Sequence, residues 1–295
     1  MDVLNLSAKQ LVDQAERFSA ITGLTKSSPE DRFFLVMGKT GSGKSTFIAR
    51  CTGQNVTVGH GFTSAIDTYN YRLPTSKLDG RLRTCRIHLI DTPGFNDTNR
   101  PDIETLGVLA SYLGASYANG IQIHGIIFLH PITDNRMSGS SMHTMEMLKM
   151  VCGWTSYVNM VVATTMWPDK SAATSNGPLR VDSQTAVETR EAELITDERF
   201  LGDVVEKGAA VFRHKETGAK DISSQTLSAR RIVEHLIAEA DSPTYKHKPL
   251  RIQREIIDER KTLAELVAGT AIAEDLDRAR REHEPSDSYA NWKLG

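Results

Sequence analysis

The 295-residue sequence predicts a three-layer α/β fold, in which helices cover both faces of a mostly parallel sheet with one antiparallel edge strand. Two observations predict this fold. Short apolar runs alternate along the chain with longer amphipathic segments, as expected where helices connect parallel strands. Some of these runs are continuously apolar, such as residues 125–129, which is typical of a strand buried on both faces.

The first predicted elements surround a glycine-rich segment. An apolar strand over 33–37 leads into residues 38–45, and a helix over 44–52 follows. Further along, apolar and polar residues alternate from Tyr69 to Leu73, and a second such strand is expected over 82–90.

A turn-rich link over 74–81 joins these two strands, so the sequence predicts an antiparallel hairpin at the sheet edge. The remaining elements follow in alternation. We expect helices over 103–117, 138–152, about 185–200 and 227–240, and strands over 125–129, 158–163 and 209–212, with a loop over 169–183.

We divide the chain into three segments: an N-terminal helical segment over 1–30, the α/β domain over 31–242 and a helical extension over 243–295. Ser7 can cap the N-terminal helix, which Pro29 separates from the domain.

Two prolines, Pro243 and Pro249, mark the start of the C-terminal extension, and residues 251–284 contain no proline and a single glycine. This pattern predicts one or two long helices. They either pack on the domain or form a surface for a helical partner or coiled coil, although the apolar spacing is too irregular for a sustained heptad.

The composition indicates a globular protein, with 39% hydrophobic and 24% charged residues. A net charge of −2 offers no general attraction for nucleic acid. The three cysteines of the chain are far apart in the sequence, which fits reduced thiols in a cytoplasmic protein. The N-terminus lacks the pattern of a signal peptide, and no apolar run is long enough for a transmembrane helix.

The segment 38–45 reads Gly-Lys-Thr-Gly-Ser-Gly-Lys-Ser, which is a complete Walker A motif placed between a strand and a helix. In such a loop the backbone N–H groups and the start of the helix surround an anion. Lys44 supplies a charge for the β- and γ-phosphates of a nucleoside triphosphate, and Ser45 a ligand for Mg²⁺. We therefore predict that the nucleotide contacts Gly38, Thr40, Gly41, Ser42, Gly43, Lys44, Ser45 and Thr46.

A second motif, Asp91-Thr92-Pro93-Gly94, follows the strand 82–90. An aspartate at the carboxyl end of a strand can hold Mg²⁺ directly or through water, and Gly94 can offer its N–H to the γ-phosphate. The pair of motifs favours a nucleotide-dependent switch over a nucleoside kinase.

Between the two motifs, Thr63 is the first choice for a further hydroxyl ligand of Mg²⁺ and Ser64 the second, unless both are surface hydroxyls. The predicted metal ligands are therefore Ser45, Thr63 and Asp91, and the predicted catalytic residues are Lys44, Thr63 and Gly94.

With residues 38–45 and 91–97 the chain resembles the GTPases related to translation factors, nearest to the septin, Toc and immunity-associated (GIMAP-like) group. The resemblance covers about residues 32–240 and implies a P-loop fold that binds Mg²⁺ with GTP or GDP. It also implies that hydrolysis is slow or is stimulated when two copies form a homodimer through the face that carries the switch segments. Ras-like relatives carry a glutamine after the glycine of the second motif, which orients the attacking water. Phe95 occupies that place here, so hydrolysis is expected to need a partner or another group of this chain, for which Asn96, Asp97 and His60 are the candidates.

The segment expected to recognise the base departs from the family pattern. The family has Asn/Thr-Lys-x-Asp, whereas this chain has Thr164-Thr165-Met166-Trp167. Three outcomes stay open: Trp167 stacks on the base or covers its edge, Asp169 reaches back to it, or the base is read loosely and ATP is accepted. A buried structural Trp167 is the alternative to all three.

Cations follow two further strands of the predicted sheet. Arg213 and His214 come after the last strand and are predicted to contact the base, while Arg136 is a loop cation that acts across a dimer or is solvated.

Three functions are compatible with these motifs. The first is a GTP-hydrolysing switch. The second is a nucleotide-dependent scaffold that hydrolyses little and dimerises, which Phe95 and the C-terminal helices favour. The third is an ATPase or a base-promiscuous NTPase, which Trp167 motivates.

Overall fold

The computed structural model describes residues 28–56, 66–78, 81–95, 100–133, 139–167, 181–214 and 222–283. Its centre is a six-stranded sheet in the order β2-β3-β1-β4-β5-β6. The strands are β1 (Asp31–Met37), β2 (Asp67–Leu78), β3 (Arg81–Asp91), β4 (Ile123–Pro131), β5 (Met160–Thr165) and β6 (Ala210–Arg213). β2 runs antiparallel to β3 at the edge, and the other neighbouring strands are parallel, which confirms the predicted sheet.

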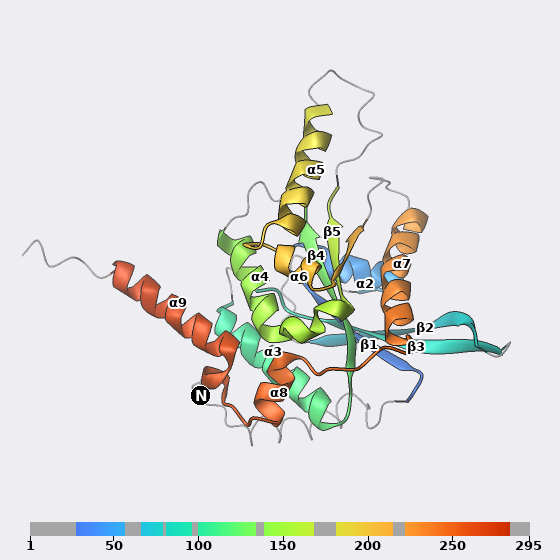
Figure 1. Cartoon of the computed structure of the whole chain (residues 1–295), viewed down its shortest axis with the longest axis horizontal. Coiled ribbons are helices and arrows are strands. Elements are labelled where there is room, and N and C mark those ends of the chain that lie inside the picture. Colours follow the sequence, from blue (N-terminus) through green and yellow to red (C-terminus); the bar gives the residue numbers. More distant parts are fainter. Residues whose placement is uncertain are drawn as a thin grey trace, which may run out of the picture.

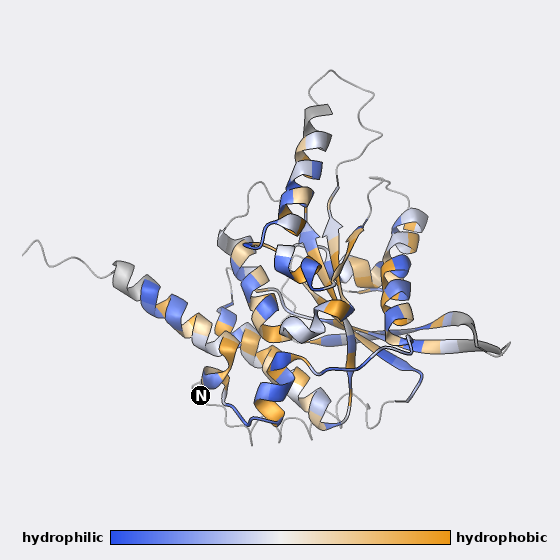
Figure 2. Ribbon diagram, viewed as in Figure 1, coloured by the Kyte–Doolittle hydropathy of each residue, from blue (hydrophilic) through white to orange (hydrophobic). Residues whose placement is uncertain are grey.

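Helices lie on both faces of this sheet (Figure 1). They are α2 (Lys44–Thr52), α3 (Asp102–Ala118), α4 (Gly139–Cys152), α5 (Val181–Thr196), α6 (Gly202–Glu206) and α7 (Ile222–Ala240). Two hydrophobic clusters correspond to the two faces: one combines strand residues with those of α2 and α7, and the other with those of α3 and α4. Apolar residues are concentrated along the strands and the inner helix faces (Figure 2). The expected three-layer α/β fold is therefore confirmed.

The edge hairpin differs from its prediction. The expected link over 74–81 is mostly strand, because β2 continues to Leu78 and β3 begins at Arg81. Pro74 lies within β2, paired with Thr84. An edge strand tolerates proline because one side of its backbone needs no strand partner, so proline was a poor signal for a turn here.

Other differences are changes of boundary. β5 begins at Met160 because a 3₁₀ helix, η2 (Trp154–Asn159), precedes it, and α7 begins at Ile222, ahead of the predicted start. The short helix α6 was not predicted, since five residues give too little periodicity to recognise. The expected helix over 7–19 lies outside the described residues.

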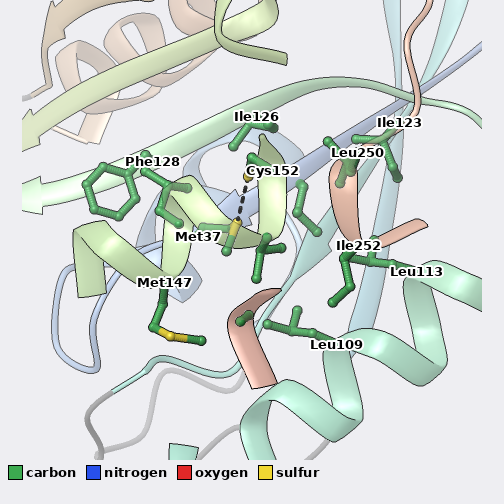
Figure 3. Close-up of a cluster of buried hydrophobic side chains, with 14 of the residues drawn as sticks. Met37, Leu109, Leu113, Ile123, Ile126, Phe128, Met147, Cys152, Leu250 and Ile252 are labelled. Carbon is green, nitrogen blue, oxygen red and sulfur yellow. Dashed lines mark hydrogen bonds between the residues drawn. The ribbon is translucent and has the colours of Figure 1, made fainter. Parts of the chain in front are cut away.

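The C-terminal extension forms α8 (Arg251–Ile257), a 3₁₀ turn η5 (Leu263–Glu265) and α9 (Val267–His283). Its apolar residues belong to the same buried cluster as those of α3 and α4. Figure 3 shows Leu250 beside Ile123, and Ile252 beside Leu113, within that cluster.

The contact between α8 and α3 is close. A Cβ atom on Gly114 would lie 3.1 Å from Cγ2 of Ile256, and the buried Gln253 side chain donates to the Leu113 carbonyl oxygen over 3.2 Å. The interpretation in which the extension packs on the domain is thus supported, whereas the described residues give no support to a helical partner. The domain boundary at residue 242 stays a prediction.

None of the helices within the described ranges is long and apolar enough to cross a membrane.

Acid is expected to destabilise this fold through His124 at the start of β4. The Phe33 N–H donates to Nδ1 of His124 over 3.1 Å, which requires a neutral ring. Burial, with the charges of Arg32 and His247, lowers the pKa of His124 to about 3. Because this is below the usual value near 6.5, the contribution to stability is complete above pH 6.5 and is lost as the pH falls. The loss by pH 5 is about 2 kcal/mol.

Urea unfolding at pH 7.5 and pH 5 measures this effect. In the His124→Asn variant an amide oxygen can accept the same hydrogen bond without titrating, so its stability should fall less with acid than that of the parent. The comparison with the parent is needed because other histidines titrate too: burial lowers the pKa of His88 and His247, whereas the hydrogen bond to Asp102 raises that of His143. Equal pH dependence in variant and parent would contradict the assignment.

Candidate functional site

The glycine-rich loop leaves the buried end of β1 and enters α2. Gly38, Gly41 and Gly43 have φ angles of 146°, 83° and 97°, a region that side chains disfavour. A Cβ on Gly38 would also lie 2.4 Å from the Leu129 carbonyl oxygen on β4. The glycines therefore allow a tight loop, folded close to the sheet, that ends at the N-terminus of a helix.

Lys44, the first residue of α2, directs its charge back across this loop. Its Nζ donates to the carbonyl oxygens of Gly38 and Lys39 over 2.9 and 3.1 Å, and the residue is only 7% exposed. The helix N-terminus and the ammonium group together give the loop the positive character that an anion requires.

Ser45 and Asp91 meet beside the loop, although 46 residues separate them in the sequence. The Ser45 hydroxyl donates to Oδ2 of Asp91 over 3.1 Å. Asp91 is 2% exposed, and its Oδ1 has no hydrogen-bond partner among the described residues. Burial raises the pKa of Asp91, whereas Lys44 and the Ser45 hydroxyl act in the opposite direction. A buried carboxylate with an unsatisfied oxygen next to a hydroxyl is a donor set that suits Mg²⁺.

Gly94 brings the second motif against the first. A Cβ at this position would lie 2.5 Å from the Thr40 backbone nitrogen and 2.8 Å from its Oγ1. The strand end is fixed as well, because the Thr92 hydroxyl donates to the Val36 carbonyl oxygen on β1 over 2.8 Å. The next residue, Phe95, points into the hydrophobic core and is 2% exposed. The segment from Asp91 to Gly94 thus forms one wall of the loop.

The carboxyl ends of β5 and β6 form the other end of the site. The Thr165 hydroxyl donates to the Ser42 carbonyl oxygen over 3.0 Å, so this strand contacts the glycine-rich loop directly. Thr164 points elsewhere: its hydroxyl donates to Oε1 of the buried Glu191 on α5 over 3.0 Å.

Trp167 lies inside the protein, at 6% exposure. Its indole N–H donates to the Thr164 carbonyl oxygen over 3.2 Å, and the Arg213 guanidinium lies 4.5 Å from its ring centre. Glu191 holds that guanidinium, accepting from Nε of Arg213 over 2.6 Å. His214 is buried too, edge-on to Phe47 and within 2.9 Å of the Ser228 hydroxyl.

Residues 33–153 match the protein family described as 50S ribosome-binding GTPase. This part of the chain is therefore similar in sequence to that family, and it has the P-loop GTPase fold. The resemblance expected from the two motifs is thereby confirmed. No curated protein matches the sequence.

Solved structures are similar to this chain at low identity. The dimerization-deficient mutant of Toc33 from Arabidopsis thaliana is 13% identical, with a TM-score of 0.50, over 82% of this chain and 96% of Toc33. Toc33 in complex with Mg²⁺ and GMPPNP is 14% identical, with a TM-score of 0.49, over 81% and 95% of the two chains.

The fold brings together most of the residues predicted for phosphate and metal. The loop residues 38–46, Asp91 and Gly94 form one continuous group, whereas Thr63, Ser64, His60, Asn96 and Asp97 lie outside the described residues. Arg136 and Asp169 lie outside them too.

At the carboxyl ends of β5 and β6, Trp167 and His214 are engaged in contacts inside the protein, and Arg213 is one-third exposed. Thr165 and Glu191 were not selected from the sequence. A glutamate in a charged helix gives no local signal, and only the fold brings it to Thr164 and Arg213.

Proposed function

We propose that this GTPase domain binds GTP and GDP with Mg²⁺ and hydrolyses GTP slowly, so that the bound nucleotide acts as a switch. The observation that carries the proposal is the contact of Gly94 with the phosphate loop at Thr40. A γ-phosphate bound in the loop would contact the segment from Asp91 to Gly94. Loss of the γ-phosphate on hydrolysis would remove this contact and so change the conformation of the segment.

The proposal assigns roles to the residues of this group. Residues 38–46 hold the phosphates, Lys44 neutralises charge that develops on them, and Ser45, Asp91 and Thr63 hold Mg²⁺. Thr164, Trp167, Arg213 and His214 remain the proposed residues of the base end. Trp167 stands where the family pattern has the aspartate that selects guanine over adenine.

Two further functions each have one observation in their favour. Phe95 is buried, so it cannot orient water, and this favours a scaffold that dimerises and hydrolyses little. Trp167 favours a site that also accepts ATP. The three cysteines are free thiols, which suits the reducing cytoplasm that we propose as the location.

Titration of the purified protein with fluorescent GTP, GDP and ATP in Mg²⁺ tests these functions. GTP and GDP binding without ATP binding supports the GTPase proposal, and equal affinities would support the promiscuous NTPase. A turnover rate per molecule that rises with protein concentration would indicate activation by dimerisation. Absence of binding by all three nucleotides would exclude all three functions.

The Asp91→Asn substitution should weaken the dependence of nucleotide affinity on Mg²⁺. The amide keeps the size of the side chain but removes the charge that attracts the cation, so affinity in Mg²⁺ should fall by roughly 10-fold to 100-fold. Affinity in EDTA should change little. Calorimetric titration with GDP measures both, with Asp241→Asn, whose aspartate pairs with Arg32, as the control. An unchanged ratio between the two conditions would contradict the role of Asp91.

A further inference from the structure

Three helices meet at His143 on α4. Its Nε2 lies 2.7 Å from Oδ2 of Asp102, the first residue of α3, and its Nδ1 lies 3.6 Å from Oδ2 of Asp275 on α9. One side chain therefore joins the C-terminal extension to two helices that pack on the sheet. The His143 side chain is 24% exposed, so its ring can exchange protons with water.

Asp275 lies where the apolar attachment of α9 has already ended. Ala268 and Ile272, on the preceding turns, are buried in the core cluster. Residues 273–278 follow them, and none of these is buried. In Figure 1 the far end of α9 extends away from the other helices. The contact with His143 is therefore important for this part of α9, because the buried apolar contacts stop about one turn earlier.

Both nitrogens of the His143 ring face a carboxylate, and this arrangement is sensitive to a proton. A neutral imidazole has a single N–H, whereas the protonated ring has two. A neutral ring that donates to Asp102 from Nε2 presents a lone pair at Nδ1 to the charged Asp275. Protonation turns Nδ1 into a donor and gives the ring a positive charge, so that both carboxylates attract it.

The charges that face His143 from the three helices are all negative. They are Asp102 of α3, Glu146 of α4 and Asp275 of α9, and Asp275 also lies 3.3 Å from Arg278 of its own helix. The hydrogen bond to Asp102 raises the pKa of His143, burial opposes this, and the three carboxylates raise the pKa further. The protonated contact is therefore complete below the usual value near 6.5 and is lost as the pH rises through the higher value in the folded protein.

We propose that His143 is a proton-dependent clamp, which holds α9 against α3 and α4 when its ring is protonated and loosens this contact when the ring is neutral. The buried residues Ala268 and Ile272 keep the first turns of α9 in place in both states. Only the part of the helix around Asp275 is released. The inference does not depend on nucleotide binding, and its test uses the protein without added nucleotide.

Hydrogen exchange of the α9 amides at pH 6 and pH 8.5, corrected for the intrinsic exchange rates, tests the clamp. In the parent, protection around Asp275 should fall by about 3-fold to 5-fold at the higher pH, as expected for an ion pair that is partly open to water. In His143→Gln and in Asp275→Asn this protection should be the same at both pH values. His235→Gln, which changes a histidine of α7 that lies against Phe212, is the matched control and should keep the pH dependence of the parent.

An NMR titration of the His143 ring gives a second readout that does not depend on the variants. Its midpoint should lie above 6.5 in the parent and move to lower pH in Asp275→Asn, where one of the facing charges is lost. A midpoint at or below 6.5 would overturn the inference. So would α9 protection that is equal at both pH values in the parent, or a pH dependence that persists in Asp275→Asn.

Discussion

Replacing Lys44 with alanine is expected to remove most of the nucleotide affinity. The ammonium is almost fully buried in the phosphate loop, where it bridges the carbonyl oxygens of Gly38 and Lys39. Its loss would leave the phosphate charge without its nearest cation. Since a hydrogen bond to a charged group contributes up to about 3 kcal/mol, affinity for GDP should fall by roughly 100-fold.

Calorimetric titration of GDP in Mg²⁺ measures this change, and circular dichroism shows whether the variant is folded. The matched control is Lys207→Ala at the residue that follows α6, where the lysine is half-exposed and its Nζ lies 4.0 Å from Asp203 Oδ2. A folded Lys44→Ala variant that binds GDP as tightly as the parent would mean that another cation holds the phosphates.

The phosphate end of this site could be predicted because its signals are local. The strand, the loop and the first helix follow one another within 31–52, and the helix bounds agree with the prediction. Gly43 and Gly53, both in the left-handed region, mark the two ends of α2. The second motif could be predicted for a similar reason. β3 pairs in parallel with β1, so the carboxyl end of β3 lies beside the end of β1 from which the loop leaves.

The base end could not be predicted in the same way, because one residue of shift in a strand reverses the face on which a side chain lies. The motif was aligned on Thr164, whereas β5 continues to Thr165, which pairs with Pro131 of β4. Thr165 consequently faces the loop and Thr164 faces α5. The spacing of residues in a degenerate motif does not determine which of two neighbouring strand residues faces the loop.

The C-terminal extension is connected through the core with the segment from Asp91 to Gly94. Phe95 directly follows Gly94 and shares its buried cluster with Leu263, Leu266 and Ile272 of the extension. A second link runs over the surface, where His143 of α4 lies 2.7 Å from Asp102 of α3 and 3.6 Å from Asp275 of α9. α3 is the next helix after Gly94 in the chain, and the extension packs on it.

Truncating Ile256 to alanine should therefore destabilise the whole domain rather than the extension alone. Ile256 is fully buried, against Gly114 of α3, and such a truncation costs about 3 kcal/mol because a cavity remains. Unfolding should stay a single transition, shifted to lower temperature, with tryptophan fluorescence and circular dichroism changing together. Leu276→Ala, on the exposed side of α9 at 50% exposure, should change stability by less than about 0.5 kcal/mol. Two separate transitions in Ile256→Ala would instead show that the extension folds as a unit of its own, joined to the domain only by the chain.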